Sequence, residues 1–159
     1  MKDRLQKILH QPVGDVKKLF GDASYRAYYR IFLADGKTLI LMALPEGKMS
    51  LSEEITNLKE KPAELPFINI QKYLAGLGLP VPALYHFSEE NRWIILEDMG
   101  DSQLWDKVAN TDTATQSRWY KKAIDLLVEL QKKTGHSTEE TRATCVAFRR
   151  YFDATLFNW

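Results

Sequence analysis

The stretch GDASYRAYYR, residues 21–30, places a tight turn directly before two arginines on a run that reads as a strand. Gly21 can adopt backbone angles that a β-carbon forbids, and successive N–H groups in such a turn can converge on phosphate oxygens. Ser24 adds a hydroxyl donor. Arg26 and Arg30 fall on one face of the strand, with a tyrosine between them, and their guanidinium forks suit phosphate. The stretch therefore predicts a hairpin, and two interpretations stay open: a turn that could cover a phosphate, and a plain turn with two solvated arginines.

The composition sets limits on partners and location. The chain has 159 residues, 45% of them hydrophobic, which is enough to bury the core of one domain or two small ones. Its 22 Lys and Arg balance 21 Asp and Glu, so net charge gives no reason to expect nucleic acid or an anionic membrane as a partner. Cys145 is the only cysteine, which excludes an intrachain disulfide and favours a cytoplasmic location with a buried, inert thiol.

The elements that position these side chains begin with strands. A short amphipathic helix is expected over residues 3–9. Strands are expected in three segments rich in β-branched and aromatic residues: 16–23, 28–34 and 38–44. Asp35 and Gly36 predict a two-residue hairpin turn between the last two. The polar residues 45–65 predict a loop, with a helical turn at 54–59.

A helix and two more strands follow. Pro66 suits the first turn of a helix that ends near Gly76 and Gly78. Its predicted apolar face consists of Phe67, Ile70, Tyr73, Leu74 and Leu77. Residues 83–87 and 92–97 then predict a second hairpin.

The remaining chain is predicted to be helical. Its first helix, ended by Gly135, carries an apolar stripe: Trp119, Ala123, Leu126, Leu127 and Leu130. The tail over 143–159 also predicts helix and is rich in aromatic residues. The order of elements indicates an α+β chain, in which a five-stranded lobe with one helix precedes a helical part.

This ordered set of motifs resembles the amino-terminal half of the aminoglycoside-phosphotransferase-like kinases. The motifs that carry the resemblance are GDAS with its arginine and tyrosine pattern, LILMALPEG, GLGLPVPALYHF and WIILEDMGD. Within that superfamily the chain is most similar to the cell-wall sugar kinases that phosphorylate the anomeric hydroxyl of N-acetylmuramate and N-acetylglucosamine. The resemblance implies a protein-kinase-like amino-terminal lobe, a five-stranded antiparallel sheet plus one helix, at 1–98. It implies a hinge and the first helices of an incomplete carboxy-terminal lobe at 99–159.

The resemblance also implies ATP with Mg²⁺, and a sugar acceptor. The GDAS turn would cover the nucleotide phosphates, and the backbone of residues 97–99 would bond the adenine edge, with Ile95 or Leu96 facing the base. The implied nucleotide-binding residues are Gly21, Asp22, Ala23, Ser24, Arg26, Arg30, Glu97, Asp98 and Met99.

Two departures from the family pattern stand out. Most relatives carry a phosphate-binding lysine in the third strand, where this chain has Met42, and the helix over 67–77 lacks the acid that pairs with that lysine. Arg26 or Arg30 is the hypothesised replacement for the missing charge. The His-Gly-Asp loop and the later metal-binding aspartate of the family also have no match here. The chain by itself is therefore expected to transfer no phosphate.

Other functions fit the same sequence. The chain could be a non-catalytic module that binds nucleotide or another protein, and its helical face could pair with a second copy. Within the superfamily, the acceptor could equally be an aminoglycoside, choline or a similar alcohol.

Overall fold

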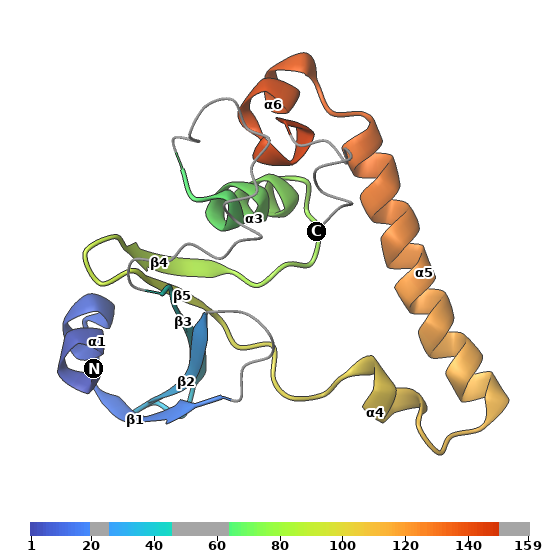
Figure 1. Ribbon diagram of the computed structural model, residues 1–159. Coiled ribbons are helices and arrows are strands. Elements are labelled where there is room, and N and C mark those ends of the chain that lie inside the picture. The colour runs from blue at the N-terminus through green and yellow to red at the C-terminus, as the bar shows by residue number, and fades with distance from the viewer. Residues whose placement is uncertain (20–25, 46–63, 150–159) are drawn as a thin grey trace.

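The computed structural model describes residues 1–19, 26–45 and 64–149. Its centre is a five-stranded sheet in the order β1-β2-β3-β5-β4, and every neighbouring pair of strands is antiparallel. The strands are β1 Val13–Lys18, β2 Ala27–Leu33, β3 Thr38–Ala43, β4 Leu84–Ser88 and β5 Trp93–Glu97. The helices are α1 Lys2–Leu9, α3 Pro66–Gly76, α4 Leu104–Val108, α5 Thr113–Gly135 and α6 Glu139–Thr144, followed by the 3₁₀ helix η1 Val146–Arg149 (Figure 1).

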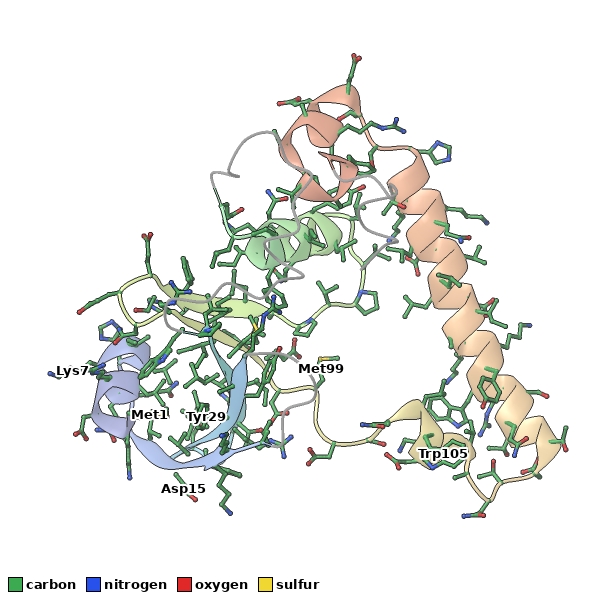
Figure 2. All side chains as sticks on the ribbon, in the orientation of Figure 1. Met1, Lys7, Asp15, Tyr29, Met99 and Trp105 are labelled. Carbon is green, nitrogen blue, oxygen red and sulfur yellow. The ribbon has the colours of Figure 1, made fainter. Side chains whose placement is uncertain are left out.

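The sheet is covered on both faces. On one face α1 inserts Leu5 into a cluster with Ile31 and Leu41, and Tyr29 of β2 packs on the same side (Figure 2). On the other face α3 places Ile68 against Met42 and other apolar residues of β3 and β5. Because side chains alternate between the faces of a strand, the continuous apolar run of β5 is buried on both sides. The predicted α+β class, with a five-stranded antiparallel sheet and helices after it, is confirmed.

The predicted strands are present, with shifted ends in the first hairpin. β1 starts at Val13 rather than at residue 16, and residues 20–23 of its predicted span lie outside the described part of the chain. The connection between β2 and β3 takes up residues 34–37 rather than two. Gly36 adopts a φ of +85°, as in hairpin loops in which a left-handed glycine follows a turn. The segment 46–63, which includes the predicted helical turn at 54–59, also lies outside the described residues.

Helix α3 begins at Pro66 as predicted, but its most buried residue is not on the predicted face. Ile68 is only 2% exposed. The reason is that α3 packs between two structures: Ile68 faces the sheet, while Tyr73 meets the ring of Phe148 in η1 edge-on at 5.6 Å. Asn69 strengthens the second contact, because it donates to the Thr144 carbonyl (3.2 Å) and accepts from the Val146 amide (2.9 Å). A single apolar stripe could not show this two-sided packing.

Helix α5 forms where it was predicted, ending at Gly135, but its apolar stripe is not part of a core. All of α5 is described, and none of its residues is buried. It runs at a distance from the sheet, from α4 back towards α6 (Figure 1). The large hydrophobic side chains that α5 exposes belong to Tyr120, Ile124, Leu126, Leu127 and Val128.

The helical tail is shorter and less regular than predicted over its described part. Thr144 ends α6, and η1 is a single 3₁₀ segment; residues 150–159 lie outside the described residues. Cys145 is buried between α6 and η1, as expected of an inert thiol. In the described portion of the chain, no helix is long and apolar enough to cross a membrane. The division into domains at residues 98 and 99 stays a prediction.

Candidate functional site

The predicted nucleotide-binding residues divide into two groups. Gly21, Asp22, Ala23 and Ser24 lie outside the described residues, so the phosphate-covering turn stays a prediction. The other five lie where β2 begins and where the chain leaves β5. They are Arg26, Arg30, Glu97, Asp98 and Met99.

The two arginines share the sheet face that α3 covers. Arg30 lies opposite Ile40 of β3, which in turn lies opposite Leu96 of β5. Ile40 and Leu96 both belong to the apolar cluster around α3. The guanidinium groups of Arg26 and Arg30 are nevertheless held in different surroundings.

Arg26 contacts Met42, the β3 residue at the position where the family resemblance implies a lysine. Its Nη1 lies 3.8 Å from Sδ of Met42, and its guanidinium carbon lies 5.6 Å from the centre of the Phe67 ring. Met42 is on β3 and fully buried, while Phe67 is in the first turn of α3. A permanent positive charge thus lies between β3 and α3, held by an aromatic ring and by a thioether, which is a weak acceptor.

Arg30 is bound to two carboxylates of the connector after β5. Nε and Nη2 donate to Asp98 at 2.6 and 3.2 Å. Nη1 and Nη2 donate to Asp101 at 2.8 and 2.7 Å. These hydrogen bonds, with Asp101 contributing most, raise the pKa of Arg30 above its already high ordinary value.

The carboxylates respond in the opposite direction. Burial opposes ionisation of Asp98, but hydrogen bonds from Arg30, the Gly100 amide and Thr38 outweigh it and lower its pKa. Hydrogen bonds from Arg30 also lower the pKa of Asp101, although that side chain is 81% exposed. Both groups are therefore ionised at neutral pH, so two negative charges share one positive guanidinium.

Glu97, the last residue of β5 before the connector, is hydrogen-bonded to the residue that precedes β4. The Glu97 amide donates to the Ala83 carbonyl at 2.9 Å, and the Glu97 carboxylate accepts from the Ala83 amide at 3.0 Å. The Glu97 amide is therefore already bonded within the sheet. Met99 follows on the connector with a side chain 63% exposed (Figure 2).

The two apolar candidates for a base contact lie on opposite faces. Leu96 belongs to the cluster on the α3 side, together with Met42, whereas Ile95 packs on the α1 side with Leu5 and Leu41. Only Leu96 thus shares a face with the arginines. Strand alternation decides this point, because neighbouring residues point to opposite faces.

The described residues do not form a metal centre. Within 1–19, 26–45 and 64–149, no group of three or more His, Cys, Asp or Glu could hold a metal ion. The Asp98 and Asp101 pair is instead bound to Arg30. These residues do not fit a magnesium ion, and we assign no step to one.

Asp101 was missed as a functional residue at the level of sequence. The motif WIILEDMGD was interpreted through its backbone, so the side chains of its acids received no role. The available signal was the spacing of two acids around Gly100 beside a strand that carries arginine. Pairing the two features requires the sheet order, because Arg30 and Asp98 are 68 positions apart in sequence and β3 lies between their strands.

Comparisons with known proteins support a relationship to sugar kinases. No protein-family model matches the chain. Over 133 residues, which is 83% of the chain, the sequence is 26% identical to an N-acetylmuramate/N-acetylglucosamine kinase from Neisseria meningitidis serogroup B (strain ATCC BAA-335 / MC58). The match covers 35% of that kinase, so the chain spans about a third of the length of this curated relative.

A solved structure shows a weaker likeness. A protein provisionally named fructosamine-3-kinase from Thermobifida fusca YX-ER1 matches with a TM-score of 0.43 and 21% identity. The match covers 65% of this chain and 32% of that protein. No conclusion about the site rests on it.

Proposed function

We propose that this chain is the ATP-binding part of a cytoplasmic small-molecule phosphotransferase whose acceptor is an amino sugar. Two lines support the proposal. The first is the sequence similarity to a kinase named for N-acetylmuramate and N-acetylglucosamine, which spans most of this chain. The second is the five-stranded sheet with one packed helix, the arrangement that the family resemblance implies.

The observation that carries the proposal is the position of Arg26. Its guanidinium lies beside Met42 of β3 and over Phe67 of α3, between the strand and the helix where the family pattern calls for a lysine. A guanidinium can donate two parallel hydrogen bonds to phosphate oxygens. We therefore assign phosphate binding to Arg26 because of its position between β3 and α3, and we assign Arg30, which is bound to Asp98 and Asp101, a different role.

The remaining contacts follow from the same assignment. The turn of residues 21–24 would cover the phosphates, the Glu97 carbonyl would accept from the adenine amino group, and the Met99 amide would donate to the ring. Leu96 would face the base, since it shares the α3 face with Arg26. Mg²⁺ would accompany ATP. Its ligands and the catalytic base are not assigned to this chain, which we propose transfers no phosphate by itself.

Nucleotide binding tests the role of Arg26 without requiring turnover. In calorimetric titrations of the full chain, Arg26→Ala should weaken ATP binding by about 10-fold to 100-fold, the value of a charge-assisted hydrogen bond. It should leave adenosine binding unchanged. Arg26→Lys keeps the charge but loses the fork, so it should retain part of the ATP affinity. Unchanged ATP affinity in Arg26→Ala would remove this residue from the site, and a wild-type chain that binds neither ligand would refute the proposed function.

We also propose that the exposed apolar face of α5 pairs with a second copy of the chain. The support is its exposure: Ile124 and Leu127, one turn apart, are 59% and 52% exposed. Exposed apolar patches of this kind are typical of association surfaces.

A further inference from the structure

We propose that Arg30 is a positioning residue: it binds Asp98 and Asp101 so that the connector after β5 is held in the shape that receives the adenine ring. This inference rests on the proposed function for its ligand. Its physical basis is the geometry of these three side chains, which we call the connector clamp.

The connector clamp uses nearly the whole guanidinium. Four of the N–H groups of Arg30 donate to carboxylate oxygens, two to Asp98 and two to Asp101. Asp98 approaches along the Nε edge of the guanidinium and Asp101 along the Nη edge, so each carboxylate is bound in the paired fashion that fixes orientation as well as distance. The Arg30 and Asp98 side chains are only 16% and 5% exposed, which shields this half of the clamp from solvent.

The clamp shapes the connector as well as anchoring it. Oδ1 of Asp98 also accepts the Gly100 amide at 2.9 Å, and Gly100 has a φ of +78°. The resulting turn brings the Asp101 carboxylate back to the same guanidinium. Without Arg30 the turn would place two carboxylates side by side with no cation between them, which is unfavourable. The turn and the arginine therefore depend on each other.

The backbone that precedes the turn is held from two sides. Glu97 is hydrogen-bonded to Ala83, next to β4, through its amide and its carboxylate. Asp98 is bound across β3 to Arg30 of β2. Only the connector from Met99 onward lies between these anchors and α4. A fixed backbone carbonyl and amide bind a flat ring without a loss of conformational entropy on binding.

The same charges argue against direct phosphate binding by Arg30. The clamp combines one positive and two negative groups, so its net charge is negative. A phosphate would have to displace Asp101, which is bound through two hydrogen bonds, and would then lie beside the negative charge of Asp98.

The test compares adenosine with ATP. Arg30→Gln in the full chain should weaken the binding of both ligands by the same factor, about 10-fold or more, which is the loss expected if the connector keeps its binding shape only about a tenth of the time. Arg30→Lys should recover only part of the affinity, since an ammonium cannot bind two carboxylates through paired bonds. Lys17→Gln is the matched control. Lys17 is the cross-strand neighbour of Arg30, and its side chain is 68% exposed. Removing this cation should change neither the adenosine affinity nor the ATP affinity.

Hydrogen exchange gives the second readout. The Gly100 amide should exchange faster in Arg30→Gln than in wild type, while the Val16 amide on β1 should not. If Arg30→Gln fails to fold, Asp101→Asn serves instead, because this exposed side chain contributes to the clamp without entering a core. Asp101→Asn should weaken the binding of adenosine and of ATP by equal factors, and these factors should be smaller than those expected for Arg30→Gln.

The outcomes separate the two proposals. Loss of ATP affinity alone in Arg30→Gln would overturn the positioning role and make Arg30 a phosphate ligand. Unchanged affinity for both ligands would also overturn it, whatever the exchange rates. If the wild-type chain binds neither adenosine nor ATP, the proposed function fails, and exchange at Gly100 then decides only whether Arg30 shapes the connector.

Discussion

At the scale of single residues, the two arginines of β2 and its entry show how position in the sheet assigns a role. Arg26 and Arg30 are four residues apart and share one face of the sheet. Arg26 lies over an aromatic ring and a sulfur atom, whereas Arg30 lies between two carboxylates. The two equal charges therefore lie in different surroundings, and we propose that Arg26 binds a ligand while Arg30 positions the connector.

The connector clamp predicts a defined dependence of stability on pH. The pKa values of Asp98 and Asp101 are lowered in the folded chain, so their ionised forms favour folding. This stabilisation should be complete above the unfolded carboxylate value of about 3.9 and disappear as the pH falls through the lower folded values. Urea unfolding of wild type and of Asp98→Asn should show it. The stability difference should be largest near neutral pH and shrink at the acidic end, and a difference that stays constant down to about pH 2 would contradict the ionic origin.

At the scale of elements, α3 connects the sheet with the carboxy-terminal helices. One side presents Ile68 to β3 and β5. The other side binds η1 and the loop after α5 through Asn69 and Tyr73, whose hydroxyl is hydrogen-bonded to Ser137. A helix packed on both sides is restrained against rotation about its own axis, which keeps Phe67 under Arg26.

The two sides of α3 should differ in their contribution to stability. Ile68→Ala should lower the free energy of unfolding by about 2–5 kcal/mol, because it leaves a cavity against fully buried Met42 and Ile94. Ile70→Ala is the matched control, because it removes the same atoms from a half-buried position. It should lower the free energy of unfolding by less than Ile68→Ala does. Denaturant unfolding of both variants measures the difference. Equal losses would mean that α3 does not dock through Ile68.

At the scale of the whole molecule, α5 is the element least integrated into the described structure. It contacts α4 at its start, and Figure 1 shows the helix leading from there towards α6 without lying on the sheet. Its caps are well formed: the Asp112 carboxylate accepts from the Thr115 amide and hydroxyl, and these bonds lower the pKa of Asp112. Local bonding therefore defines the helix, while its apolar side chains remain exposed.

Exposure of this face predicts association that depends on concentration. In sedimentation velocity, the wild-type chain should shift to a larger species as concentration rises, because burying Ile124 and Leu127 removes apolar surface from water. The double variant Ile124→Asp with Leu127→Asp should remain a monomer over the same range. Asp125→Ser, a polar change in the same turn, should associate like wild type. A wild-type chain that stays monomeric throughout would refute the proposed pairing of copies.

The sequence by itself determined most of the elements. Strands over 28–34, 38–44 and 92–97 were predictable because their β-branched and aromatic residues fill a buried sheet, and Gly36 marked a hairpin that needs a left-handed residue. Pro66 and Gly135 marked the start of α3 and the end of α5 for similarly local reasons. Such signals depend on the backbone preferences of a few neighbouring residues, so the sequence contains them in full.

Only the tertiary structure decided which residues meet. Arg30 and Asp101 are 71 residues apart, and the order of the strands brings the Asp101 carboxylate to the Arg30 guanidinium. Ile68 is buried because α3 lies between the sheet and η1, while the equally apolar stripe of α5 stays exposed because no described element covers it. Burial and charge pairing are properties of surroundings assembled from distant segments, and a local pattern carries no information about which segment that will be.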